Sequence, residues 1–139
     1  MERRTYLTAI ASIGTAATAG CTTSFTGGGD VEMPVEVVLT EWRVEPETTT
    51  LPAGEVEFKA KNEGEDHHEL VVRQREEGSG RLRQVGEVDD IGPGTFDWLT
   101  VDLEPGAYEL CCLMREEEED GEIEDHYRRG MHTTVTVEE

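Results

Sequence analysis

Residues 105–112 read Pro-Gly-Ala-Tyr-Glu-Leu-Cys-Cys. After the Pro-Gly turn, large apolar side chains alternate with other residues, which is the pattern of a β-strand that buries one face. Side chains two positions apart point to the same face of a strand. Tyr108, Leu110 and Cys112 therefore share the core-facing side, and Cys111 falls on the opposite side.

The last stretch of the chain, residues 131–137, reads Met-His-Thr-Thr-Val-Thr-Val and has the same period of two. Met131 has the parity of the two valines that follow it, so it is predicted to face the core, with His132 on the solvent side. These two strands place a thiol and a thioether at core-facing positions.

The alternation recurs upstream, between turns rich in glycine, proline and asparagine. The predicted core-facing sets are Val35, Val37 and Leu39; Val56, Phe58 and Ala60; His68, Leu70 and Val72; and Leu99, Val101 and Leu103. A further strand is expected near residues 82–88, and residues 51–54 are expected to form a turn. No segment has a helical apolar stripe. The sequence therefore predicts an all-β Greek-key sandwich of seven or eight strands.

Residues of metal-ligand type fall at core-facing strand ends. His68, Cys112 and Met131 occupy such positions, and His126 lies in the loop before the last strand, where it is able to swing over them. Two imidazoles, one thiolate and one thioether are the ligand set of a blue-copper site. Thiolate and thioether favour Cu(I), whereas imidazole accepts both oxidation states. The set therefore predicts one copper ion that alternates between Cu(I) and Cu(II).

Three segments carry a family resemblance: His-Glu-Leu at 68–70, Tyr-Glu-Leu-Cys-Cys at 108–112 and His-Tyr-Arg-Arg-Gly-Met at 126–131. Together they resemble the plastocyanin, azurin and halocyanin family of cupredoxins, in its haloarchaeal lipoprotein form. The resemblance implies a copper-binding electron carrier, not an enzyme, with Met131 as the axial ligand. It also implies that electrons pass through an exposed edge of His126.

One feature departs from that family, which places only a few residues between its cysteine and second histidine. Here thirteen residues, 113–125, separate Cys112 from His126. This segment holds the acidic run 116–120, which is expected to be a solvated loop. It either bulges from a fixed base or leaves the site loose and weak.

Several other interpretations remain open at this level. Cys111 is either an outward, partly buried thiol or an alternative ligand, and zinc also suits thiolate and imidazole. Two alternative functions also remain open: the protein stores, senses or delivers copper outside a redox chain, or it acts without metal as a surface interaction domain.

The N-terminus has the features of an export signal. Residues 1–20 combine Arg3-Arg4, a short apolar run and small residues, and resemble a twin-arginine signal peptide that ends in a lipobox before Cys21. Cys21 is expected to carry lipid and to anchor the protein at the outer side of the cell membrane. Residues 21–33 then form a flexible linker, and residues 34–139 form the cupredoxin-like domain.

The composition restricts the partners. The formal net charge is −20, with 32 acidic residues and only two lysines. Phosphate would be repelled, so nucleic acid is not an expected partner. Acid-rich, lysine-poor surfaces resemble those of extreme halophiles; a mesophilic protein with one acidic face is the alternative. We expect a monomer whose partners are membrane-bound redox proteins of a respiratory or similar chain.

Overall fold

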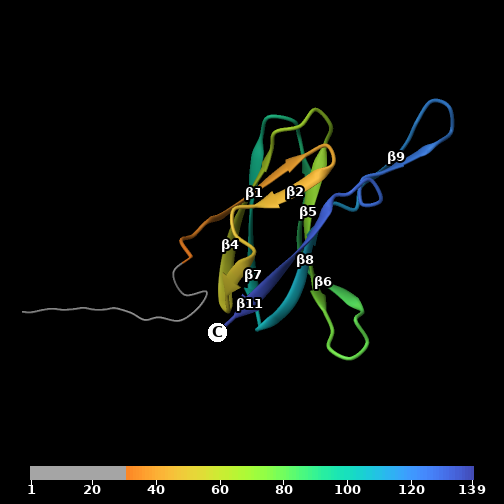
Figure 1. Ribbon diagram of the computed structural model, residues 1–139. Helices are drawn as coiled ribbons and strands as arrows, with labels where there is room; N and C mark the ends of the chain where they lie inside the picture. The colour runs from red at the N-terminus through yellow and green to blue at the C-terminus, as the bar shows by residue number, and fades with distance from the viewer. Residues whose placement is uncertain (1–30) are drawn as a thin grey trace, which may run out of the picture.

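The protein is a two-layer β-sandwich in the computed structural model, which describes residues 31–139 (Figure 1). The expected signal peptide, Cys21 and most of the expected linker lie outside the described residues. The first sheet has the order β2-β1-β4-β7. Its strands are β1 (Val35–Thr40), β2 (Arg43–Pro46), β4 (Gly54–Asn62) and β7 (Phe96–Leu103).

The second sheet has the order β3-β11-β8-β5-β6 and carries most of the ligand-type residues. Its strands are β3 (Thr50–Pro52), β5 (His68–Arg75), β6 (Leu82–Ile91), β8 (Gly106–Cys111) and β11 (His132–Glu138). Strand β8 lies between β5 and β11 and is antiparallel to both. This arrangement puts the start of β5, the end of β8 and the start of β11 at one end of the sandwich.

The all-β class is confirmed, because residues 31–139 contain strands and no helix. Eleven strands are present there, against the seven or eight expected. The difference comes from strands of only three residues, β3, β9 (Arg115–Glu117) and β10 (Ile123–Asp125), which are too short to show an alternation. No helix in residues 31–139 is long and apolar enough to cross a membrane.

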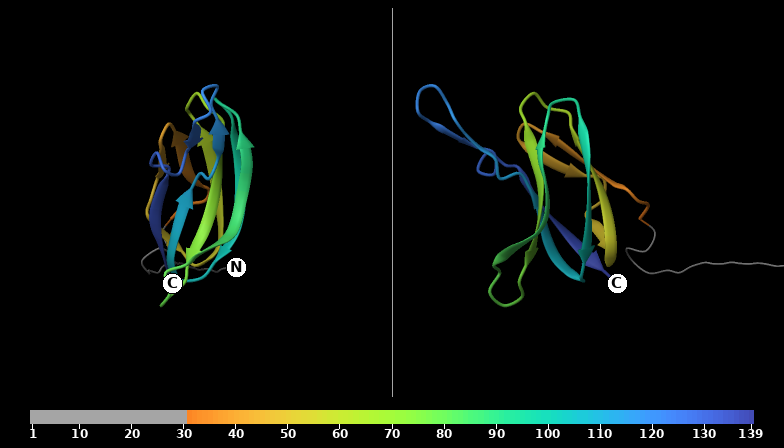
Figure 2. Two further views of the ribbon diagram at one scale, coloured as in Figure 1. Left: turned by 90° about the vertical axis from the view of Figure 1, so that its right-hand side faces the viewer. Right: turned by 180° about the vertical axis from the view of Figure 1, so that it is seen from behind.

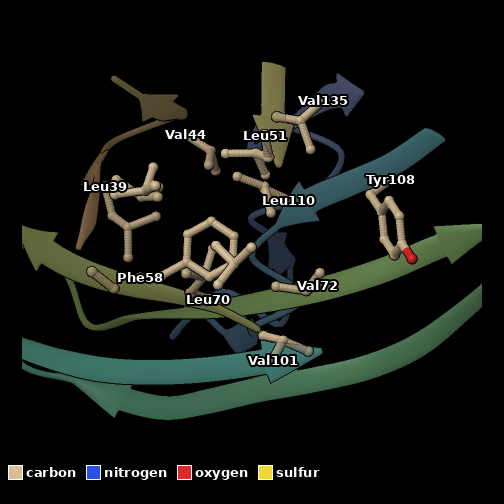
Figure 3. Packing of buried hydrophobic residues seen from close by; sticks show 14 of the residues in the cluster. Leu39, Val44, Leu51, Phe58, Leu70, Val72, Val101, Tyr108, Leu110 and Val135 are labelled. Atoms are coloured by element: carbon tan, nitrogen blue, oxygen red, sulfur yellow. The ribbon is translucent and has the colours of Figure 1, made fainter. Parts of the chain in front are cut away.

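The core lies between the two sheets, and its side chains come from the alternating positions of both (Figure 3). In β1, every second residue is fully buried, as predicted. Strand β5 differs from the prediction because Val71, on its outer face, is buried as well. The predicted turn at residues 51–54 is also incomplete, because Leu51 is a fully buried residue of β3, which pairs with β11.

The segment 113–125 is not the loop that we expected. Strands β9 and β10 pair antiparallel and form a hairpin that projects from the sandwich (Figures 1 and 2). Residues 115–123 of this hairpin are all exposed. The acidic run is thus solvated, as predicted, but it belongs to a paired ribbon rather than to a loop.

Candidate metal centre

Two imidazoles and one thiol meet at the end of the sandwich where β5 begins and β8 ends. His68 Nδ1 lies 3.3 Å from His126 Nδ1, and Cys112 Sγ lies 4.0 Å from the first nitrogen and 3.5 Å from the second. All three side chains are fully buried. The structure thus brings together three of the four residues predicted as ligands, each with a donor atom directed at a common point.

These spacings suit a metal ion held in a trigonal plane. With metal–nitrogen bonds of about 2.0 Å and metal–sulfur bonds of about 2.3 Å, the donor atoms of such a plane are roughly 3.5 to 3.8 Å apart. The three separations lie close to that range. Soft sulfur with two imidazoles is the donor set of type 1 copper. The residues present therefore fit one copper ion without rearrangement of the strands.

Met131 lies beside this group and is fully buried. Its backbone joins the other candidate ligands, because its carbonyl accepts a hydrogen bond from the Cys112 amide at 3.0 Å and its amide donates to the His126 carbonyl at 3.2 Å. These bonds tie the backbone of Met131 to both residues. Met131 would be the fourth ligand of such a set.

The Cys112 thiol is fully buried. Burial raises the pKa of Cys112 to about 11, although the backbone amides of Glu69 and Met114 favour the thiolate. The Glu69 amide lies 3.5 Å from the Cys112 sulfur. A bound metal cation reverses this preference and deprotonates a coordinating thiol.

His126 is more enclosed than the resemblance implied. Its ring is fully buried, so the exposed edge expected for electron passage is not present. Trp42 packs edge-on against the imidazole with 5.0 Å between the ring centroids, and Glu116 Oε2 of the hairpin lies 3.7 Å from Nε2. Burial, followed by the nearby His68, lowers the pKa of His126. Sequence reasoning missed this cover, because Trp42 lies in the distant turn between β1 and β2.

The outer nitrogen of His68 has a partner that the sequence did not indicate. Nε2 of His68 lies 2.7 Å from Glu41 Oε2. Glu41 follows β1, where the chain turns into β2. Nothing in the local sequence marks this glutamate among 32 acidic residues.

The neighbouring residues of ligand type point away from the centre. His67 is exposed and lies 2.7 Å from Asp90, and His132 is exposed and stacks on Tyr127 with the centroids 4.4 Å apart. Cys111 does face outward, but it is fully buried rather than partly buried. Burial, followed by the nearby Glu109, raises the pKa of Cys111 to about 12. This thiol is therefore protonated and enclosed on the other side of the sheet.

A cluster of three acidic residues lies next to the centre. Ligand atoms of Glu69, Glu87 and Asp89 lie within 4.8 Å of one another. Burial and a hydrogen bond with Asp89 raise the pKa of Glu69 to about 7. The Leu113 amide donates to the Glu69 carboxylate at 3.0 Å, so this side chain supports the backbone that follows Cys112.

Comparison with known proteins places the chain in a family. Residues 9–123 match the family described as "Cupredoxin-like domain". The chain belongs to the cupredoxin-like domain family. The matched segment includes His68 and Cys112 and ends before His126 and Met131. Among curated proteins, no sequence matches this cupredoxin-like chain.

Solved structures support the same fold. A reduced auracyanin from Roseiflexus castenholzii is 20% identical, with a TM-score of 0.57 over 78% of this chain and 98% of that chain. An azurin from Methylomonas sp. strain J is 15% identical, with a TM-score of 0.57 over 78% of this chain and 100% of that chain. Auracyanin A from Chloroflexus aurantiacus, described as a blue copper protein, is 16% identical, with a TM-score of 0.53 over 76% of this chain and 99% of that chain. At these identities the likeness establishes the cupredoxin fold alone.

Proposed function

We propose that this cupredoxin-like protein carries single electrons on one type 1 copper ion, Cu(I) or Cu(II). His68, Cys112 and His126 would hold the ion in a plane, with Met131 as the axial ligand. The observation that carries this proposal is the meeting of two Nδ1 atoms and one Sγ atom within 4.0 Å in a fully buried site. Bound copper would supply a one-electron couple that the side chains themselves lack.

The protein itself would hold the candidate ligands in fixed positions and keep water away from the ion. His68 begins β5, Cys112 follows β8 and Met131 precedes β11, and β8 pairs with both of the other strands. The Cys112 amide is bonded to the Met131 carbonyl, so the separation between these two residues is set by the backbone. A fixed set of donors that suits neither oxidation state fully keeps the rearrangement between them small. No bound substrate is transformed in this scheme, so the protein would be a carrier and not an enzyme.

We further propose that the carrier is exported and anchored by lipid on Cys21 at the outer side of the cell membrane. Residues 1–20 would be a twin-arginine signal peptide, residues 21–33 a linker and residues 34–139 the working domain. The arginine pair, the short apolar run and the small residues before Cys21 support this proposal. The partners would be membrane-bound redox proteins, and the acid-rich, lysine-poor surface supports a halophilic setting.

The test is a visible absorption spectrum of copper-loaded protein in molar salt, with the adjacent cysteines as a matched pair. Cys112→Ser removes the sulfur that lies 3.5 Å from His126 Nδ1 and should abolish the intense copper–thiolate band. Cys111→Ser changes a buried thiol on the opposite face and should leave the band in place. A band that is lost in Cys111→Ser and kept in Cys112→Ser would contradict the proposal. The lack of any band in the unaltered protein would favour a metal-free interaction domain.

One observation favours a second function, copper storage or delivery. Because His126 is fully buried, the imidazole edge offers no direct contact to a redox partner. Electron self-exchange of the copper-loaded protein, measured from NMR line broadening in mixtures of Cu(I) and Cu(II) forms, separates the two functions. Fast exchange supports the carrier, whereas very slow exchange with tight copper binding supports storage.

A further inference from the structure

Glu41 makes a direct contact with a candidate ligand from outside the ligand set. Its Oε2 lies 2.7 Å from His68 Nε2, on a ring that is fully buried. A carboxylate accepts hydrogen bonds and donates none, so Nε2 carries the proton of this bond. The Nδ1 atom, which faces Cys112 and His126, is then left with its lone pair free for a metal ion.

The carboxylate of Glu41 is itself held in place by the chain that precedes His68. The Glu65 amide donates to Oε1 at 2.8 Å and to Oε2 at 3.1 Å, and the Asp66 amide donates to Oε2 at 3.2 Å. Two backbone donors thus fix the orientation of a side chain that is only partly exposed. This support distinguishes Glu41 from a flexible surface carboxylate that meets a histidine by chance.

Gly64 supplies the space that the carboxylate occupies. A Cβ atom built at Gly64 would overlap Glu41 Oε2 and would lie 2.9 Å from the carboxyl carbon. The φ angle of Gly64 lies outside the left-handed region, so the glycine is needed here for room and not for backbone conformation. An alanine at this position would displace the carboxylate without altering any candidate ligand.

The two histidines of the centre differ in this respect. His126 Nε2 has no hydrogen-bond partner, and Glu116 Oε2, the carboxylate oxygen next to it, lies 3.7 Å away on a side chain that is 46% exposed. Only His68 therefore has a carboxylate in hydrogen-bond contact, and Glu116 offers a comparable charge without that bond. This difference makes Glu116 the natural control for Glu41.

We propose that Glu41 is a positioning residue that fixes the Nε2-protonated tautomer of His68 and lowers the reduction potential of the bound copper. The second half of this statement rests on the proposed copper function. A carboxylate hydrogen-bonded to a ligating imidazole makes it a stronger donor, and outer partners of this kind change metal affinity about 10- to 100-fold. The more highly charged Cu(II) gains more from a stronger donor and a nearby negative charge than Cu(I) does.

The tautomer is tested without copper. Nitrogen-15 NMR of the metal-free protein should show His68 protonated on Nε2 with a bare Nδ1. Glu41→Gln should keep this tautomer, because the amide oxygen still accepts the bond, and Glu41→Leu should lose the preference. A bare Nε2 in the unaltered protein would overturn the proposal. This measurement is independent of whether the chain carries electrons.

The potential is tested on copper-loaded protein in molar salt. Glu41→Gln should weaken Cu(II) binding relative to Cu(I) about tenfold or more, which corresponds to a rise of about 59 mV or more for a one-electron couple. Gly64→Ala should raise the potential in the same direction, because it moves the carboxylate away from His68. Glu116→Gln should change it much less. Equal shifts for Glu41→Gln and Glu116→Gln would mean that charge alone matters and would overturn the role of the bond.

Discussion

The β9–β10 hairpin is predicted to be dispensable for both the fold and the metal centre. Arg115 and Asp125 are directly opposite partners at its base. Residues 116–124 can therefore be replaced by Asn-Gly, a two-residue turn that joins adjacent antiparallel strands. The variant removes the acidic ribbon and leaves His126 at its place after Asp125.

The expected change in stability is small and favourable. Residues 116–123 are all exposed and Glu124 is partly buried but not apolar, so their removal takes little apolar surface out of the core. Shortening the connection from nine residues to two reduces the entropy of loop closure by about 1.3 kcal/mol. The pairing of Glu116 with Glu124 across the hairpin sets like charges opposite each other, which destabilises the ribbon itself.

Because the replacement changes the net charge, its effect on stability should also depend on the salt concentration. The replacement removes seven acidic side chains and takes the formal net charge of the chain from −20 to −13. Self-repulsion falls accordingly, and the gain should be larger in dilute salt, where the Debye length is about 30 Å at 0.01 M, than at 1 M, where it is about 3 Å. The variant should therefore tolerate low salt better than the unaltered protein.

The assay combines urea unfolding at two salt concentrations with the visible spectrum of the copper-loaded variant. We expect an unfolding free energy equal to or above that of the unaltered protein, and an unchanged copper–thiolate band. Loss of the band with the fold intact would refute the reasoning, because the hairpin would then be part of the site. Destabilisation by more than about 2 kcal/mol in molar salt would refute the estimate of what the hairpin buries.

Two further substitutions test the centre and its outer support. Met131→Leu nearly conserves volume and should cost less than about 1.5 kcal/mol in urea unfolding, while a shift of the copper potential would reveal axial ligation. Burial would raise the pKa of Glu109, but hydrogen bonds from Tyr127 and Arg73 outweigh it and lower the pKa. Its stabilising effect is therefore present above the unfolded carboxyl pKa and lost as the pH falls through the folded pKa. Glu109→Gln should flatten that acid limb of the unfolding free energy, and an unchanged limb would contradict the assignment.

Much of the sequence prediction rests on strand alternation, which assigns each residue to one face of its sheet. Alternation alone predicts that His68, Cys112 and Met131 face the core, and all three are fully buried. Alternation is reliable here because a shift by one residue would move a whole apolar set to the other face. The same argument places His132 on the solvent side, and it is exposed.

Alternation gave the wrong prediction where a residue is buried outside the core between the two sheets. Val71 and Cys111 face outward, yet both are buried, because they are opposite partners on β5 and β8 in the interior of a five-stranded sheet. Glu41 and Trp42 reach the centre from a turn, where no period exists to predict a direction. Tertiary contacts of this kind depend on how the β1–β2 turn lies over the end of the second sheet.

The position of His126 after so long an insertion has a local cause. The next residue, Tyr127, lies on the opposite side of the sheet end, where its hydroxyl donates to Glu109 at 2.6 Å and its ring packs under Arg73. On the other side, the His126 amide donates to the Met114 carbonyl at 3.0 Å, just before the hairpin begins. These contacts hold the turn from both faces, so the length of the ribbon between Met114 and His126 does not loosen the imidazole. An insertion between two such fixed points can grow into solvent while the donor atoms stay together, which explains how a thirteen-residue spacing coexists with a compact candidate metal centre.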